Sequence, residues 1–322
     1  MKRPTTRTCA NERLLSLFAR KINLTSKNKL ARVIHEPFAV LRRKILVALA
    51  AAGRCACRVN IRTFWGKRMC VVLPEKLSLE LFRYGFYEED LTWTVLQFLR
   101  PGKVFLDVGA HIGYFALLAS EIVGTEGLVV AFEPTRSIFS VLAANTEKSD
   151  NITINNLAAF SHNGEQTFND YGLEYSMFNS IYSARLDVDI GRKLVATSYP
   201  VEVASLDSYA SHHSLRPDFI KIDAENAEFD ILKGMSMILD EMRPILSLEV
   251  GDITKERISS SHDCISFLKG KGYIPIEIRK RRLQQHVLRE KYTYSNLLFI
   301  PEERSLQYGI SENPPGDISQ AT

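Results

Sequence analysis

The chain lacks the features that mark membrane-spanning, zinc-binding and repeat proteins. It has only five cysteines in 322 residues, and none of them forms the CxxC pairs that zinc sites use. Its longest uninterrupted apolar run, residues 45–52, has eight residues, whereas a transmembrane helix needs about 20. It has no internal repeat and no low-complexity tract. We therefore expect a cytoplasmic globular protein with reduced thiols.

Charge is divided unevenly along the chain. Residues 1–60 hold 14 lysines and arginines against two glutamates, whereas the remainder holds 27 basic and 35 acidic residues. A basic arm on an acidic body indicates two parts with different roles. We expect residues 1–58 to form a basic helical extension that packs on the domain or on an acidic surface, with peripheral membrane contact as the alternative. The basic residues 42–44 imitate a signal peptide, but the n-region before them is too long.

Apolar periodicity divides the rest of the chain into three segments. Residues 59–102 predict strands with a turn at Gly66, then one helical stretch over 77–99 that Pro101 ends. Residues 103–300 alternate apolar runs with helical stretches, which predicts an α/β domain with a parallel sheet. Residues 301–322 lack periodicity, and we expect an irregular tail. The strands predicted in the domain cover 104–108, 128–132, 152–157, 219–222, 245–250, 273–278 and 297–300.

A glycine-containing loop follows the first of these strands. Residues 105–113 end a buried strand near Asp107 and then open a helix with Gly109 and Gly113. Such strand–turn–helix units bind nucleotides. Gly109 would let the backbone approach a ligand, and Gly113 would let the helix pack closely on the strand. The spacing is GxxxG, however, and lacks the GxGxxG of pyrophosphate-binding loops.

Two carboxylates narrow the choice of nucleotide. Asp107 would repel a pyrophosphate but suits a ligand with an amino group and a sulfonium, and S-adenosylmethionine carries both. Glu133 ends the next strand 26 residues later, where it can accept hydrogen bonds from both ribose hydroxyls. We therefore expect S-adenosylmethionine rather than NAD. The cofactor-binding residues would be Asp107, Gly109, Ala110, His111, Ile112, Gly113, Glu133 and Pro134.

The chain resembles the FkbM-type methyltransferases, within the larger class of Rossmann-like methyltransferases. The segments that carry the likeness are 84–88, 107–115, 131–134, 205–209, 218–228 and 244–249. The resemblance implies a seven-stranded, mostly parallel sheet with an antiparallel last strand and flanking helices. It also implies that the Asp107 loop and Glu133 bind S-adenosylmethionine, and that a methyl group passes to a hydroxyl, often on a sugar, glycan or secondary metabolite.

Two positions depart from the family pattern. His111 stands where asparagine is usual, and Asn226 stands where glycine is usual. We expect His111 to hydrogen-bond the loop rather than to transfer protons. Asn226 tolerates a positive φ better than most residues, so we expect the turn to survive.

Acidic residues after the later strands are the catalytic candidates. Methyl transfer to an alcohol needs a positioned oxygen and a base, and ligands of open α/β sheets lie beyond the carboxyl ends of the strands. Asp223, Glu225 and Glu249 are therefore candidates for base or acceptor binding, with helix capping by Asp223 or Glu225 as the alternative. Asp223 and Glu249 could also hold Mg²⁺, but the sequence identifies no third ligand. A divalent metal is not expected, although it stays open.

The acceptor and the role of the basic arm stay open at this level. We expect a small-molecule or glycan acceptor. The arm would also suit a nucleic-acid methyltransferase, but no NPPY-like tetrapeptide follows the strand at 219–222. A methyltransferase-like module without catalysis, recruited through the arm, is the third reading. The aromatic stretch of Tyr171, Tyr175, Phe178 and Tyr182 could form a lid over the acceptor or pack at the edge of the domain.

Overall fold

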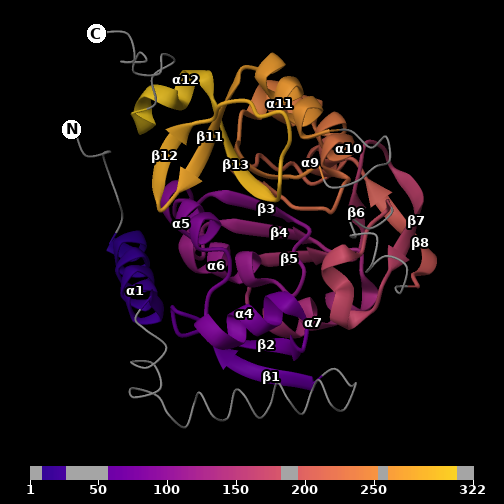
Figure 1. Ribbon diagram of the computed structural model, residues 1–322. Coiled ribbons are helices and arrows are strands. Elements are labelled where there is room, and N and C mark those ends of the chain that lie inside the picture. The colour runs from indigo at the N-terminus through magenta and orange to yellow at the C-terminus, as the bar shows by residue number, and fades with distance from the viewer. Residues whose placement is uncertain (1–8, 27–56, 183–194, 253–259, 310–322) are drawn as a thin grey trace.

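The computed structural model describes residues 9–26, 57–182, 195–252 and 260–309. An eight-stranded sheet with helices on both faces forms the body of the molecule (Figure 1). A two-stranded hairpin and a three-stranded sheet flank it. Among the described helices, none has the length and hydropathy to span a bilayer.

The large sheet has the strand order β12-β11-β13-β10-β9-β3-β4-β5. Neighbours from β10 to β5 run parallel, whereas β13 runs antiparallel to both β10 and β11. The expected parallel sheet with an antiparallel last strand is thus confirmed. A polar hairpin strand, β12, makes eight strands instead of the expected seven. The strands are β3 (Val104–Val108), β4 (Leu128–Phe132), β5 (Ile152–Asn155), β9 (Phe219–Ile222), β10 (Ile245–Val250), β11 (Tyr273–Arg279), β12 (Arg282–Gln285) and β13 (Ser295–Pro301).

Different helices cover the two faces of this sheet. Successive residues of a strand point to opposite faces, so Phe105 and Leu106 belong to different hydrophobic clusters. The Phe105 side packs against α5 (Glu89–Phe98), α6 (Tyr114–Val123) and α7 (Arg136–Thr146). The Leu106 side packs against α9 (Leu206–His212), α10 (Glu228–Lys233), the π-helical turn η2 (Ile238–Met242) and α11 (Ser261–Gly270).

The chain changes direction across the sheet at β3. It moves from β3 to β4 and β5 on one side, and it later returns to β9 on the other side of β3. The register pairs Val108 with Ile222 at the carboxyl ends of β3 and β9. The loops that follow these two strands therefore start side by side, at the kind of switch point where open α/β sheets bind ligands.

The segment before the sheet contains one hairpin and two helices. The expected strands form the hairpin β1 (Cys57–Arg62) and β2 (Arg68–Leu73), with Gly66 in the turn at φ +91°. The single helical stretch expected over 77–99 is wrong. The structure has α4 (Lys76–Tyr84) and α5 because Gly85 ends α4 in the left-handed conformation, φ +72°.

A three-stranded sheet that the sequence pattern did not indicate lies at one end of the molecule (Figure 1). It contains β6 (Ala158–Ala159), β7 (Gly164–Asp170) and β8 (Thr197–Ala204), and the short helix η1 (Leu173–Phe178) follows β7. In β7 only Phe168 is buried, so the strand has little apolar alternation for sequence reasoning to detect.

Residues 302–308, expected to be irregular, form α12 (Glu302–Ser305) and η3 (Leu306–Tyr308). Tertiary contacts explain why these residues form helical turns. The Arg243 guanidinium donates two hydrogen bonds of 2.9 Å to the Glu303 carboxylate, and the Tyr308 ring packs 4.8 Å from the Phe98 ring. Residues 310–322 lie outside the described part of the chain.

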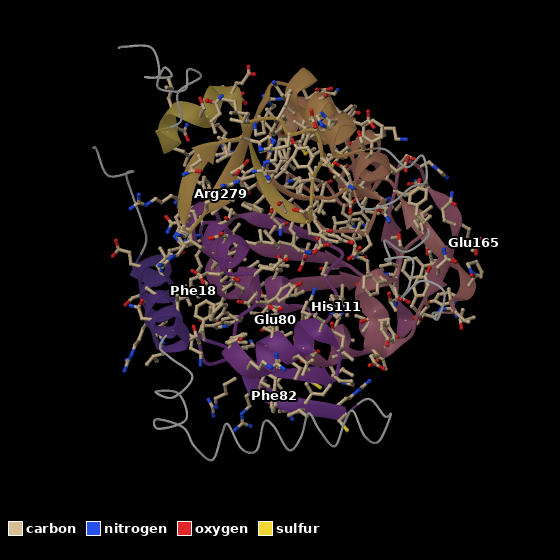
Figure 2. The ribbon with its side chains drawn as sticks, in the orientation of Figure 1. Phe18, Glu80, Phe82, His111, Glu165 and Arg279 are labelled. Carbon is tan, nitrogen blue, oxygen red and sulfur yellow. The ribbon has the colours of Figure 1, made fainter. Side chains whose placement is uncertain are left out.

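The first helix, α1 (Cys9–Ser26), packs into the main hydrophobic cluster through Leu14, Phe18 and Ile22. Phe18, which Figure 2 labels on α1, is 1% exposed, and its ring lies 4.9 Å from the Phe64 ring. The helical part of the expected extension is thus seen over 9–26, and residues 27–56 lie outside the described ranges. The proposed division at residues 58, 102 and 300 stays a prediction.

Replacing Phe18 tests whether α1 is part of the folded domain. Phe18→Ala should lower the free energy of unfolding by about 3–5 kcal/mol, because it empties a buried aromatic site. The matched control on the exposed face of α1, Arg20→Ala, should change it by no more than about 0.5 kcal/mol. Urea unfolding measures both. Equal, small effects of the two variants would show that α1 does not contribute to the core.

Candidate active site

A cavity of about 240 Å³, here called the inner cavity, opens where β3, β4, β9 and β10 end. The loops after the strands and the end of β10 supply its polar wall. The sequence-predicted residues that line it are Gly109, His111, Glu133, Pro134, Asp223, Glu225 and Glu249. The structure therefore brings half of the predicted cofactor residues and all three catalytic candidates to one place. The other predicted cofactor residues do not line the cavity; these are Asp107, Ala110, Ile112 and Gly113.

Two glycines shape the loop after β3, because a side chain at either position would meet another part of the protein. Gly109 has φ +74°, and a Cβ there would lie 1.8 Å from the carbonyl oxygen of Asp223. The close neighbour that requires glycine is thus the loop after β9. Gly113 has φ +90°, and a Cβ there would lie 2.6 Å from Cδ1 of Leu142. It lets α6 approach α7 rather than the strand.

Glu133 presents a fixed carboxylate to the inner cavity from the end of β4. Its Oε2 accepts a hydrogen bond of 2.9 Å from the backbone N–H of His111, and its Oε1 accepts one of 2.8 Å from that of Thr135. The residue is only 5% exposed. Burial raises its pKa, while His111 and the two N–H groups oppose this shift. An oriented, buried carboxylate of this kind suits a pair of ligand hydroxyls.

His111 joins the two sides of the inner cavity. It has a positive φ of 50°, and its Nε2 lies 3.0 Å from Oγ of Ser176 in η1. Figure 2 shows His111 in the region next to the salmon-coloured η1 helix. The ring of His111, expected to hydrogen-bond the loop, instead contacts η1, and the His111 backbone N–H donates to Glu133.

Beneath the inner cavity, Lys221 links the loops after β3 and β9. Its Nζ lies 3.4 Å from Oδ1 of Asp107 and 3.4 Å from Oδ2 of Asp223, and it donates to the carbonyl oxygen of Gly109 at 3.0 Å. Asp107 is 0% exposed and Lys221 is 2% exposed. Asp107 therefore lies under the cavity wall, paired with Lys221. Sequence reasoning missed Lys221, although a lysine within the apolar strand at 219–222 is a visible signal.

The charges of this cluster depend on one another. Burial alone would lower the pKa of Lys221, but the carboxylates of Asp223, Asp107 and Glu88 outweigh burial and raise it. Burial raises the pKa of Asp107, and Lys221 partly offsets that rise. The ammonium group thus stays charged and compensates the carboxylates around it.

The three catalytic candidates form a compact acidic group. One oxygen each of Asp223, Glu225 and Glu249 lies within 4.8 Å of the others. Glu225 therefore supplies the third carboxylate that the sequence did not identify for a cation. Acidic groups of this kind are common without an ion, so we assign no metal here.

The helix-capping alternative for Asp223 and Glu225 finds little support in the hydrogen bonds. The N-cap of α10 is Ala227, and Oε1 of Glu228 accepts from the backbone N–H groups of Ala224 and Asn226. Asn226 has φ +84°, as expected for the turn that it forms.

Other parts of the inner cavity come from segments to which the sequence assigned no site. From the aromatic stretch, the described lining residues are Ser176, Asn179 and Ile181, so its rings do not supply the wall seen here. The segment before the sheet contributes Glu75, Lys76, Leu77, Tyr87 and Glu88. Tyr294, which directly precedes β13, also lines the cavity. Tyr87 and Glu88 belong to a segment that carries the family likeness, but its role was not apparent from the sequence.

Comparisons with known proteins agree with this geometry. A protein-family model described as a methyltransferase FkbM domain matches residues 107–275. Hexuronic acid methyltransferase AglP of Haloferax volcanii is 26% identical over 176 residues, which cover 52% of this chain and 66% of AglP. AMB antimetabolite synthetase AmbE of Pseudomonas aeruginosa is 28% identical over 217 residues, which cover 58% of this chain and 10% of AmbE. The chain thus spans less than two thirds of the length of either relative.

Among solved structures, methyltransferase FkbM from Methylobacillus flagellatus is similar over 69% of this chain and 53% of its own. The sequence identity is 15% and the TM-score is 0.39.

Removing the charge of Lys221 tests the buried cluster. Lys221→Met should lower the free energy of unfolding by about 3–5 kcal/mol, because it leaves Asp107 buried without a cation. The double variant Lys221→Met, Asp107→Asn should lose less, because the second change removes the stranded charge. The same substitution at a surface pair, Lys103→Met beside Asp218, should cost no more than about 1 kcal/mol. If urea unfolding shows that Lys221→Met and Lys103→Met lower the free energy of unfolding equally, the proposed role of Lys221 is contradicted.

Proposed function

The chain belongs to the methyltransferase FkbM domain family, and on this premise we propose that it is an S-adenosylmethionine-dependent O-methyltransferase. The acceptor group is a hydroxyl on a sugar, glycan or secondary metabolite. The observation that carries the proposal is Glu133, a buried carboxylate fixed by two backbone N–H groups at the end of β4 and turned to the inner cavity.

The residues around the inner cavity fit S-adenosylmethionine. Glu133 suits the two ribose hydroxyls, since each carboxylate oxygen has a second lone pair to offer. Gly109 lines the cavity with its backbone. When bound, S-adenosylmethionine supplies a methyl group on a positively charged sulfur. The carboxylates of Asp223, Glu225 and Glu249 give that charge a favourable environment.

The negative charge of the cavity wall also favours S-adenosylmethionine over competing nucleotides. Six carboxylates belong to the described lining: Glu75, Glu88, Glu133, Asp223, Glu225 and Glu249. Lys76 is the single lysine or arginine among the same lining residues. Such a wall repels the pyrophosphate of NAD and the phosphates of a nucleic acid, whereas it favours a sulfonium. We therefore rank a nucleic-acid methyltransferase below the proposed activity.

The acceptor proposal draws on the chemistry of the wall and on one relative. Hydroxyl methylation needs a base at the end of the cavity, and carboxylates are present there. The relative AglP is named as a hexuronic acid methyltransferase, which supports a sugar compound as acceptor. A module without catalysis ranks lower, because the carboxylates are all in place. A cytoplasmic location, and contact of residues 1–58 with a membrane or acidic surface, remain predictions.

Calorimetry with S-adenosylmethionine tests the proposal at Glu133. The wild-type chain should bind the cofactor, and Glu133→Gln should weaken binding by at least tenfold, since hydrogen bonds to a charged group contribute about 1.5–3 kcal/mol. The control Glu147→Gln, at an exposed site after α7, should bind like the wild type. Circular dichroism would confirm that all three proteins are folded. No binding by the wild type, or equal affinity of Glu133→Gln, would refute the cofactor assignment.

A further inference from the structure

We propose that a second cavity beside the inner one binds the methyl acceptor, a neutral polyhydroxyl compound such as a glycoside, and that Glu88 at their junction is the general base. This inference rests on the methyl-transfer function proposed above. It assigns a role to a residue outside the three acidic candidates that the sequence indicated.

The two cavities share a wall. The second, here called the outer cavity, has a volume of about 410 Å³ and lies along the start of α5, β11 and the start of β13. Glu88, Glu249 and Tyr294 line both cavities. A methyl donor in the inner cavity and an acceptor in the outer cavity would therefore meet at these three side chains. Holding two reactants in adjoining sites is the main requirement for group transfer.

The Glu88 side chain is turned to this junction by specific contacts. Its Oε2 accepts a hydrogen bond of 3.2 Å from Nδ2 of Asn296, and Asn296 lies directly opposite Glu249 in the β13–β10 register. Asn296 of β13 thus contacts Glu88 and pairs with Glu249 in the sheet, although Glu88 and Asn296 are 208 positions apart in sequence.

The common structural role for this residue does not apply. Glu88 is the N-cap of α5, where a carboxylate usually accepts hydrogen bonds from the first turn, but no such side-chain bond forms. Its φ of +42° is also unfavourable for a residue with a side chain. Backbone strain of this kind gathers at functional sites, and His111 and Glu225 on the same cavity also have positive φ.

The surroundings suit proton transfer near neutral pH. Burial and the negative charges of Asp223 and Glu80 raise the pKa of Glu88 to about 7, while Lys221 and the Asn296 hydrogen bond act in the opposite direction. Glu80, which Figure 2 labels, belongs to α4. The other charged or titratable groups near the junction are Glu249 of β10, Tyr294 beside β13, Glu89 and Asp90 of α5, and Tyr87 and Tyr114. A base whose pKa is near the working pH is the most effective kind.

The proposed step balances without a further reactant. Glu88 accepts the proton of the acceptor hydroxyl while the hydroxyl oxygen forms its bond to the methyl carbon. The carbon–sulfur bond breaks, and its electron pair stays on sulfur as S-adenosylhomocysteine forms.

The outer cavity favours a neutral acceptor. Its two arginines, Arg279 and Arg289, already donate to the carboxylate of Glu277, and Figure 2 marks Arg279 on β11. Glu88 and Glu249 add negative charge at the junction, so a carboxylate on the acceptor would be repelled. Tyr294 is 41% exposed and offers a ring against which the apolar face of a sugar can pack.

A transfer assay with radiolabelled S-adenosylmethionine tests this proposal. The probes are methyl glycosides of glucose, mannose and galactose, together with the matching methyl uronides. The wild type should methylate a neutral glycoside, with kcat/KM rising as pH rises through about 7, because the base must be ionised. Glu88→Gln should lower kcat by at least about 100-fold at pH 8 and remove that inflection. Glu165→Gln, at the exposed start of β7 and outside both cavity linings, is the matched control and should change neither.

Calorimetry adds readouts that do not depend on turnover. Glu88→Gln should still bind S-adenosylmethionine, with less than the tenfold weakening expected of Glu133→Gln. Tyr294→Ala should weaken binding of the glycoside that the wild type methylates best by at least fivefold, measured with S-adenosylhomocysteine present. It should also raise KM more than it lowers kcat.

The outcomes separate this inference from the proposed function. Retention of kcat within threefold by Glu88→Gln, or persistence of the inflection near pH 7, would overturn the base assignment. A preference for uronides, or no transfer to any probe by a wild type that binds S-adenosylmethionine, would overturn the acceptor class. Failure of the wild type to bind S-adenosylmethionine would refute the proposed function itself.

Discussion

The buried ammonium group of Lys221 is the contact on which the site depends. It lies 3.4 Å from the carboxylates of Asp107 and Asp223 and donates to the carbonyl of Gly109. One cation therefore binds the loops after β3 and β9 at the place where the sheet changes direction. Asp223 can approach Gly109 only because position 109 has no side chain. Charge pairing and close packing together fix the base of the inner cavity, which lies beneath Glu133, Glu225 and Glu249.

The acidic wall above this floor follows from the same arrangement. Parallel strands deliver their carboxyl ends to one edge, and here those ends or the loops after them carry Glu133, Asp223, Glu225 and Glu249. Lys221 compensates only the buried part of this charge, and the remaining carboxylates favour a positively charged ligand above it. The segment before the sheet completes the site from outside the parallel strands by adding Glu88. The proposed donor and acceptor positions then lie on the two sides of Glu88, Glu249 and Tyr294.

Sequence reasoning succeeded where the signal is local. An apolar strand, an acidic residue and a glycine turn are contiguous around Asp107, so the loop after β3 and Glu133, which line the inner cavity, could be located from the sequence; their cofactor role stays a proposal. The close approach of Asp223 to Gly109 and the bond from Asn296 to Glu88 join residues more than 100 positions apart, and no local pattern shows them. Gly85 is a local helix stop that the apolar spacing of 77–99 obscured. The strands β7 and β12 are too polar to give a clear alternation.

A crystal structure of the full chain with S-adenosylhomocysteine would test the central claim most directly, because it locates the ribose and the sulfur at once. The account predicts that the ribose hydroxyls lie about 3 Å from the Glu133 carboxylate, and that the sulfur faces the junction formed by Glu88, Glu249 and Tyr294. Binding at another surface, or a sulfur turned away from that junction, would contradict it.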